Sequence, residues 1–175
     1  LVGSEMCIRD RNRTATDRDR KGCQGNHQLC RALSDAVSKL RNLDGSDAST
    51  KKISTSLIQE MHATLLDSVR GEGKGRGRIR TDQNYIVMGS EIVYVPPPPA
   101  ELPKLMGNWE SYVNSDKEVD PLVQIGIAHY QFEAIHPFGD GNGRIGRLLI
   151  ALNMFQKDLL PFPVLYVSTF LERFR

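Results

Sequence analysis

Apolar residues recur at steps of three and four positions along much of this chain, which is the spacing of helices with one buried face. The first such run begins between residues 26 and 29 and ends in the polar loop at Gly45. Ser54 and Thr55 offer N-caps for the next predicted helix. Its expected buried stripe is Leu57, Ile58, Met61, Leu65 and Leu66. His62 lies among them, and a single histidine on an apolar stripe is interpreted as a packed structural residue.

Three further helices are predicted downstream. Residues 102–113 have an apolar face that includes Trp109, which is expected in the core rather than at a ligand. Asp120 and Pro121 begin the second of them, because proline is favoured in the first turn of a helix. That helix and the third, over residues 145–155, are apolar nearly all round, so both are predicted to be buried.

Residues 85–95 show a different pattern, with two short runs of β-branched and aromatic residues on either side of Gly89 and Ser90. Glycine in the first position of a two-residue turn is typical of a β-hairpin. The prolines of residues 96–99 end strand pairing, because proline lacks the N–H that a sheet needs. The pattern as a whole therefore predicts a mostly helical fold with one hairpin.

The composition is that of an ordinary single domain: 175 residues, 39% hydrophobic and 25% charged, with a net charge of +2. This charge is too small to indicate nucleic-acid binding through bulk charge. No apolar run has the length of a transmembrane helix, and no signal peptide with an apolar middle is recognised. Cys7, Cys23 and Cys30 lack metal-binding spacing, so we interpret them as free thiols of a cytoplasmic protein without a membrane partner.

Residues 1–28 differ from the rest because they are rich in charge and poor in apolar side chains. They are predicted to be disordered or artefactual, ahead of a folded domain over residues 29–175. Residues 6–11 resemble the translation of a transposon end used to prepare sequencing libraries. An artefactual origin of residues 1–11 therefore stays open beside a genuine flexible tail. The last apolar run stops at Arg175 without a capping signal, which we interpret as a C-terminal truncation.

Most of the residues suited to chemistry lie between two apolar runs, in residues 136–147 with the sequence HPFGDGNGRIGR. The glycines let backbone N–H groups approach a ligand, and the helix that follows adds the positive end of its dipole. Arg144 and Arg147 can bind phosphate oxygens with two hydrogen bonds each. Asp140 suits magnesium, and His136 is a candidate base. The spacing therefore predicts a phosphate-binding turn.

Three other interpretations of the same stretch carry less weight. Residues 141–146 fit the dinucleotide-binding pattern, but they do not follow a strand in a βαβ unit. A calcium loop fails because Arg144 stands where a third oxygen ligand belongs. A zinc site at His129, Glu133 and His136 lacks a glutamate between paired histidines and a supporting cysteine pair. His129 is therefore interpreted as a core histidine.

Residues 136–147 resemble the signature of the Fic (Fic/Doc) family, H-P-F-x-[D/E]-G-N-G-R-x-x-R, at every specified position. The resemblance implies an all-α fold, namely a Fic-type helical bundle with a short β-hairpin, the flap, beside the active-site loop. It also implies a protein adenylyltransferase, which transfers AMP from ATP to a Ser, Thr or Tyr hydroxyl of a target protein. The Doc branch phosphorylates its target instead and carries lysine at the position of Gly143, so glycine favours adenylylation.

The resemblance implies a role for each signature residue. His136 would be the base that accepts the proton of the target hydroxyl, and Asp140 would hold magnesium. Arg144 would pair with the terminal phosphates, supported by Arg147. Phe138 would anchor the loop in the core. The nucleotide-binding set would comprise Gly141, Asn142, Gly143, Arg144, Ile145, Gly146 and Arg147.

For partners, the resemblance implies a protein substrate whose main chain pairs with the edge of the flap. Arg80 and Asn84 match an arginine and an asparagine common near that flap. Self-modification, a homodimer, and nucleic acid bound through a missing C-terminal domain are left open. The family's inhibitory motif, [S/T]-x-x-x-E-[G/N], has no match in its expected place before residue 29, and the match at residues 68–73 is interpreted as a coincidence.

Two functions from different classes remain at this point. One is the adenylyltransferase, and the other is a nucleotide-binding regulatory module without transfer. The intact His136 and Asp140 favour the enzyme, because a protein that only binds a nucleotide needs no base. Transfer of another phosphate-linked group, such as a different nucleotide or phosphocholine, is also left open.

Overall fold

The computed structural model describes residues 17–42, 52–67, 75–115 and 119–161. Their order is α1 (Asp17–Asn42), α2 (Thr55–Leu65), β1 (Ile86–Met88), β2 (Glu91–Tyr94), the 3-10 helix η4 (Pro99–Glu101), α3 (Leu102–Val113), α4 (Pro121–Ile135) and α5 (Asn142–Gln156). The predicted fold class, a helical bundle with one short hairpin, is confirmed.

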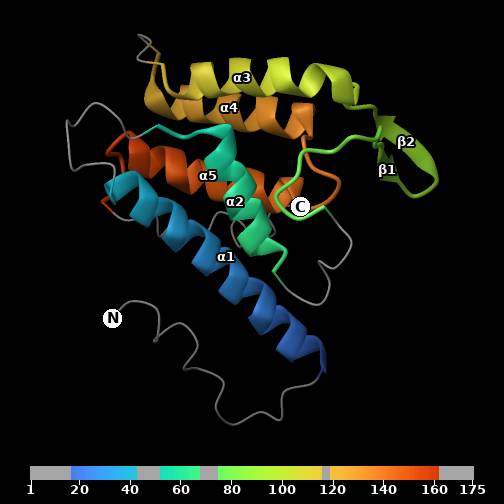
Figure 1. Cartoon of the computed structure of the whole chain (residues 1–175), viewed down its shortest axis with the longest axis horizontal. Coiled ribbons are helices and arrows are strands. Elements are labelled where there is room, and N and C mark those ends of the chain that lie inside the picture. The colour runs from blue at the N-terminus through green and yellow to red at the C-terminus, as the bar shows by residue number, and fades with distance from the viewer. Residues whose placement is uncertain (1–16, 43–51, 68–74, 116–118, 162–175) are drawn as a thin grey trace.

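Helix α4 packs against α3 on one side and α5 on the other, while α1 contacts both α2 and α5 (Figure 1). The core takes side chains from all five of these helices. Its aromatic centre joins α3 to α4 and to the signature loop: the ring centroids of Trp109 and Phe132 lie 5.9 Å apart, and those of Phe132 and Phe138 lie 6.5 Å apart. The core position predicted for Trp109 is confirmed, since it is 2% exposed.

Two helix starts follow the predicted capping chemistry. The Ser54 hydroxyl accepts a hydrogen bond from the Leu57 N–H at the start of α2 (3.2 Å). The Asp120 carboxylate accepts from the N–H groups of Leu122 (2.8 Å) and Val123 (3.3 Å) at the start of α4, with Pro121 in the first turn. These bonds satisfy N–H groups that have no partner inside their own helix.

The hairpin forms as predicted, with each strand within one residue of the expected bounds. Gly89 has a φ of +63°, which suits the first position of its two-residue turn. Ile86 pairs with Tyr94 but Val87 pairs with Ile92, so Val93 is an extra residue that bends the second strand. The Tyr94 hydroxyl donates to the Ala134 carbonyl (3.0 Å), which ties the hairpin to the end of α4.

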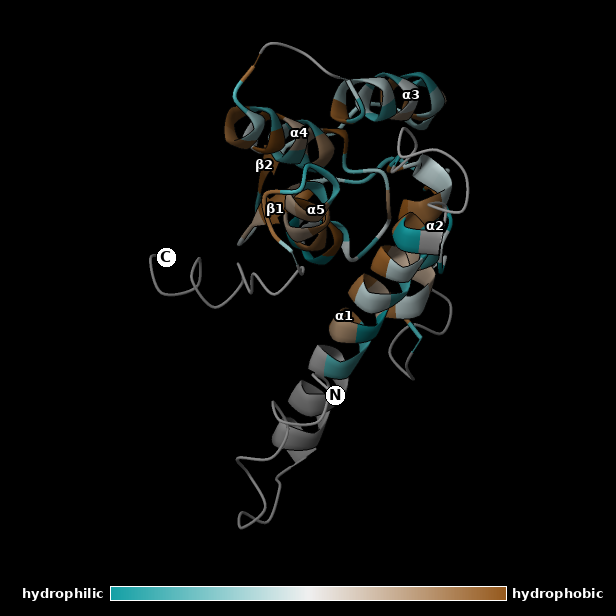
Figure 2. Ribbon diagram, turned by 90° about the vertical axis from the view of Figure 1, so that its left-hand side faces the viewer, coloured by the Kyte–Doolittle hydropathy of each residue, from teal (hydrophilic) through white to brown (hydrophobic). Residues whose placement is uncertain are grey.

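The prediction that α4 is buried on all sides is wrong. Its inner face is buried as expected, but Leu122, Ile127 and Tyr130 are 58%, 40% and 74% exposed. The apolar residues of a helix indicate how much of its surface could be buried. The number of helices packed around it determines how much of that surface is buried. Hydrophobic colouring along α4 and the hairpin is visible in Figure 2. In contrast, α5 buries Ile145, Leu149, Ala151, Leu152 and Phe155, as predicted for a central helix.

Helix α1 begins at Asp17 and not between residues 26 and 29, where the apolar pattern placed its start. Residues 1–16, the match at residues 68–73 and the last apolar run lie outside the described residues. Cys30 is exposed and free, as predicted for its thiol. Within the described ranges, no helix is both long and apolar enough to cross a membrane.

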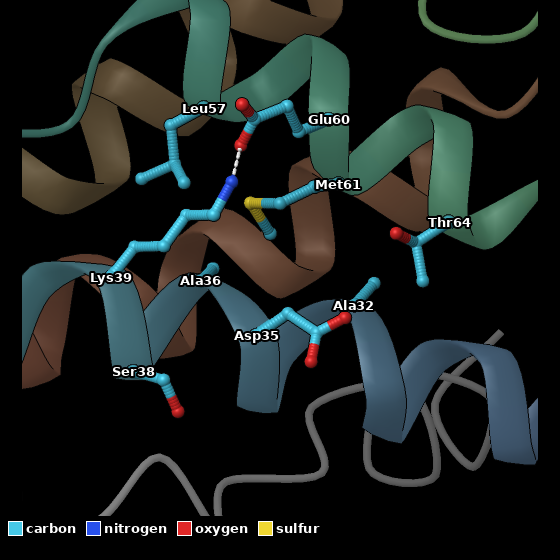
Figure 3. Close-up of a pocket in the computed structure, with 9 residues that line it drawn as sticks. All are labelled: Ala32, Asp35, Ala36, Ser38, Lys39, Leu57, Glu60, Met61 and Thr64. Atoms are coloured by element: carbon cyan, nitrogen blue, oxygen red, sulfur yellow. Dashed lines mark hydrogen bonds and ion pairs between the residues drawn. The ribbon is translucent and has the colours of Figure 1, made fainter.

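A cavity of about 280 Å³ lies between α1 and α2 (Figure 3). Its charged lining is partly neutralised, because Lys39 of α1 forms an ion pair with Glu60 of α2. None of the signature residues line this cavity. It is therefore separate from the residues that the sequence singled out for chemistry.

Candidate active site

The signature loop begins where α4 ends, at His136. This residue adopts a left-handed backbone conformation (φ 50°, ψ 59°), which is uncommon outside glycine. Its N–H still donates to the Phe132 carbonyl (3.0 Å), so His136 closes the last turn of the helix. The chain then turns away, and the imidazole is left half-buried at the helix end.

The imidazole of His136 has a defined tautomer. Its Nδ1 lies 3.3 Å from the Glu133 carbonyl oxygen. A carbonyl oxygen only accepts, so Nδ1 is the donor, and in the neutral form of the imidazole the lone pair is on Nε2. That is the state a general base requires.

The loop after His136 is held by an asparagine rather than by its own backbone. The Asn142 side chain accepts from the Phe138 N–H (2.9 Å) and donates to the Phe138 carbonyl (2.7 Å). Asn142 is 2% exposed, and Phe138 is 1% exposed with its ring in the core. The anchoring role implied for Phe138 fits this position. The side chain of Asn142 is thus used inside the protein, so only its backbone N–H remains suited to a ligand.

The start of helix α5 has the backbone geometry that the predicted anion site needs. Gly141 precedes it with a φ of +84°, a left-handed conformation that suits glycine. The N–H groups in the first turn, on Asn142, Gly143 and Arg144, have no carbonyl partner within the helix. The next one is already used, because the Ile145 N–H donates to the Gly141 carbonyl (3.0 Å).

Both signature arginines lean back toward the start of α5. The Nη2 of Arg144 lies 3.5 Å from the Asp140 carboxylate, and these side chains are 38% and 41% exposed. The Nη1 of Arg147 lies 3.5 Å from the position that a Cβ on Gly143 would take. Two guanidinium groups and the helix dipole therefore concentrate positive charge at one place, as an anionic phosphate group requires.

Asp140 fits the magnesium role implied for it. In the part of the chain that the structure describes, no three His, Cys, Asp or Glu side chains gather as a metal site. Magnesium is commonly held by one or two carboxylates together with substrate phosphates and water. A partly exposed carboxylate beside an anion site is such a donor, so the residues present suit an ion that binds together with a nucleotide.

Two residues of the predicted nucleotide-binding set, Ile145 and Gly146, have packing roles in the structure. Ile145 is completely buried. A Cβ on Gly146 would lie 2.1 Å from a carboxylate oxygen of Glu133, so the glycine makes room for that side chain of α4. The Gly146 carbonyl also lies 3.2 Å from Nδ1 of His129. Neither residue offers a side chain to a nucleotide, and their contact with one stays a prediction.

His62 supports the signature loop from helix α2. Its ring is fully buried and stacks on Phe138 with centroids 3.9 Å apart and planes within 5°. One ring nitrogen accepts from the Gly77 N–H (2.9 Å), and the other contacts the Asp140 carbonyl (2.8 Å). Burial lowers the pKa of His62; the Asp140 carbonyl opposes this shift, and the positive charge of Arg144 adds to it. The prediction of a packed histidine is confirmed, but the sequence did not indicate that it contacts the loop.

Arg80 fixes the same loop from the other side. Its N–H donates to the Pro137 carbonyl and its Nε to the His136 carbonyl, both at 2.9 Å. The two terminal nitrogens donate to the carbonyls of Asp82 (3.0 Å) and Pro97. Burial lowers the pKa of this guanidinium, although arginine stays charged at any pH a protein survives.

Asn84 completes this arrangement, since its side-chain amide donates to the Phe138 carbonyl (3.3 Å). Arg80 and Asn84 therefore connect the base of the hairpin to the loop that carries His136. The resemblance pointed to both residues, but their partners lie more than fifty positions away. No local pattern could have identified those partners.

Comparison with known proteins adds an independent finding. A model of the Fic/DOC family matches residues 52–154. A protein named protein adenylyltransferase Fic from Drosophila mojavensis is 34% identical over 114 residues, which cover 61% of this chain and 22% of the relative. The corresponding protein of Drosophila grimshawi is 33% identical over 111 residues, covering 61% of this chain and 23% of the relative. This chain thus spans about a fifth of the length of these relatives.

Comparison with solved structures indicates the same family. A Fic family protein from Desulfovibrio desulfuricans G20 is 29% identical with a TM-score of 0.60, covering 83% of this chain and 39% of that one. Fic-1 from C. elegans, solved as a fragment, is 28% identical with a TM-score of 0.56, covering 76% of this chain and 37% of that one. With more than half of its residues matched by the family model, and with the loop, helix and hairpin arranged as described, the chain belongs to the Fic/DOC family.

Proposed function

We propose that this protein transfers AMP from ATP to the hydroxyl of a Ser, Thr or Tyr side chain in a target protein. One observation carries the proposal: a single short loop joins a histidine whose Nδ1 faces a carbonyl oxygen to the positively charged start of α5. A base and an anion site so close together suit the attack of a hydroxyl on a phosphate.

The reaction balances with the groups present and two substrates. His136 Nε2 takes the proton of the target hydroxyl, and the hydroxyl oxygen forms a bond to the α-phosphorus of ATP. The bond from that phosphorus to the oxygen bridging the α- and β-phosphates breaks, and pyrophosphate leaves. The target carries AMP, and the proton passes from His136 to solvent.

The remaining signature residues bind and orient the nucleotide. Arg144 and Arg147 and the first-turn N–H groups of α5 neutralise the phosphate oxygens, which lowers the barrier because the charge is met by donors already in place. A magnesium ion held by Asp140 would supply further charge neutralisation on the phosphates. Phosphoryl-type transfers need mainly this combination of positioning and charge stabilisation.

The hairpin is the proposed docking site for the target. Its residues are mostly exposed, and strands β1 and β2 pair only with each other among the described residues. Their outer edges can therefore accept an extended segment through main-chain hydrogen bonds. The bonds of Tyr94 to the end of α4 and of Arg80 to the hairpin base hold this edge beside His136.

Incubation of the purified chain with ATP labelled on the α- or the γ-phosphate tests the proposal. AMP transfer predicts label on protein from α-labelled ATP alone. Label from γ alone would establish phosphorylation, and nucleotide binding without label from either position would favour a regulatory module. A parallel set of other nucleotides reveals a different donor.

The His136→Ala variant separates chemistry from binding. It should lose AMP transfer by a factor of about 100 or more, since a positioned base typically contributes this much. The affinity for Mg-ATP should change less than about twofold, because the imidazole does not belong to the anion site. Loss of ATP binding with retained fold would mean that the histidine has a structural role only.

A further inference from the structure

Each of the two ring nitrogens of His62 makes a different hydrogen bond. Nδ1 accepts from the Gly77 N–H (2.9 Å), and because an N–H only donates, Nδ1 must carry the lone pair. The proton is therefore on Nε2, which donates to the Asp140 carbonyl (2.8 Å). With its ring fully buried, His62 has one tautomer and one orientation.

This bond determines where the next N–H points. In a trans peptide unit the C=O and the N–H lie in one plane and point in opposite directions. Because the Asp140 carbonyl points at α2, the Gly141 N–H points to the other side of the loop. That N–H comes just before those of the first turn of α5.

Without an anchor, this peptide unit would be easy to turn over. Glycine adopts positive and negative φ with similar ease, and turns that differ by a peptide rotation of about 180° are close in energy when glycine follows the rotating unit. Gly141 has a φ of +84°. The backbone preferences of glycine therefore do little to keep the Gly141 N–H on one side of the loop.

The His62 ring also fills the space behind the glycine. A Cβ on Gly141 would lie 3.3 Å from Nε2 and 3.6 Å from Nη2 of Arg144. The ring is stacked on Phe138 with nearly parallel planes, which opposes tilting of the ring. The hydrogen bond, the stacking and the close contact act on three residues of the loop, namely Asp140, Phe138 and Gly141.

We infer that His62 is a positioning residue that locks the Asp140–Gly141 peptide, so that the Gly141 N–H faces the phosphates of the nucleotide. The inference rests on the proposed function, because it assigns this N–H to the site that binds ATP. His62 itself contacts neither the nucleotide nor the target. It acts through the backbone.

Three substitutions separate the contacts of His62. His62→Gln places an amide donor near the position of Nε2 and keeps the bond to Asp140. His62→Asn places an oxygen near the position of Nδ1 and keeps the bond to Gly77. His62→Phe keeps the stacking and removes both bonds. Gln59→Ala is the matched control, because the Gln59 amide donates to the Gly77 carbonyl (3.0 Å) from the same helix without a bond to Asp140.

The measurement is the dissociation constant for Mg-ATP beside that for adenosine, which has no phosphates. His62→Phe and His62→Asn should weaken Mg-ATP binding about tenfold, the loss of one good hydrogen bond. Adenosine binding should change less than about twofold in both. His62→Gln should stay within about threefold of the unmodified protein for Mg-ATP, and Gln59→Ala should match the unmodified protein. Thermal unfolding confirms that each variant is folded at the assay temperature.

The inference is overturned if His62→Asn binds Mg-ATP as well as His62→Gln, or if Mg-ATP and adenosine weaken equally. A loss in Gln59→Ala as large as in His62→Phe would assign the effect to the Gly77 turn and would also overturn it.

The backbone amide signal of Gly141, recorded by NMR without any nucleotide, keeps the two proposals distinguishable. In His62→Phe this signal should shift or double, whereas in His62→Gln it should stay near its original position. If the unmodified protein does not bind Mg-ATP, the proposed function fails. The Gly141 signal then still tests whether His62 fixes the Asp140–Gly141 peptide. An unchanged signal in His62→Phe contradicts that inference.

Discussion

At the scale of single residues, the site divides its polar side chains into two groups. His136, Asp140 and Arg144 are partly exposed, so a substrate can reach them. His62, Arg80 and Asn142 are buried, and each makes at least one hydrogen bond to a backbone atom of the signature loop. Buried polar side chains that are fully bonded rigidify their surroundings, so the second group holds the first in place.

Asn142→Ala should destabilise the fold by about 1–3 kcal/mol, because the Phe138 N–H and carbonyl lose their partner in a buried place. Asn153→Ala is the control. Asn153 is equally buried on the same helix, but its amide bonds only to the Leu149 carbonyl one turn back. Urea unfolding of the two variants compares them, and equal losses would contradict the bracing role of Asn142.

The lowered pKa of His62 predicts a pH dependence of stability. The folded state keeps this ring neutral below its ordinary pKa of 6.5, whereas the unfolded chain takes up a proton there. Stability is therefore unaffected by this group above pH 6.5 and is lost as the pH falls below it, by at most about 1.4 kcal/mol per pH unit. Denaturant unfolding in magnesium-free buffer should show a steeper loss between pH 7.5 and 5.5 than His62→Gln shows. Parallel curves would contradict the prediction.

At the scale of elements, local chemistry predicted where helices start and which residues make the turn of the hairpin. The structure has helix caps at Ser54 and Asp120 and the hairpin turn at Gly89. These features were predictable because caps and turns depend on residues that are neighbours in sequence. The exposure of Ile127 and Tyr130 could not be predicted in the same way. Burial of a helix depends on which other helices cover it, and hydropathy alone does not supply that information.

Asp120→Ala should cost about 1 kcal/mol of stability, because two N–H groups at the start of α4 lose their acceptor. Asp120→Asn should retain most of that stability, since its side-chain oxygen can accept the same bonds. AMP transfer should be unchanged in both, because the cap is a helix length away from His136. Thermal unfolding and the labelled-ATP assay check the two statements, and a loss of transfer with full stability would contradict them.

At the scale of the whole molecule, the site is assembled from segments distant in sequence: helix α2, residues 75–84, the end of α4 and the start of α5. The signature motif identified His136, Asp140 and the arginines because they lie within twelve consecutive positions. The contacts of Arg80 and His62 with the loop could be found only in three dimensions, since 56 and 78 positions separate these residues from the atoms they hold. Sequence patterns of short range therefore contain the candidate reacting groups but not the supporting contacts that come from distant segments.

Arg80→Lys tests this assembly. A lysine has one nitrogen in place of a planar fork, so it cannot reach the His136, Asp82 and Pro97 carbonyls together. AMP transfer should fall about tenfold or more, and the melting temperature should drop. Arg78→Lys, an exposed neighbour, should change transfer less than about twofold. Equal activities of the two variants would show that the hairpin base and the loop are not coupled through Arg80.

The position of His136 at the last turn of α4 also limits insertions and deletions within that helix. Each residue of an α-helix advances the chain by about 100° around its axis. Deleting one residue from the middle of α4 would swing the imidazole by that angle while the Asp120 cap and the core stayed where they are. Loops elsewhere can absorb insertions and deletions, but this helix can only keep its length of 15 residues or lose its alignment with α5.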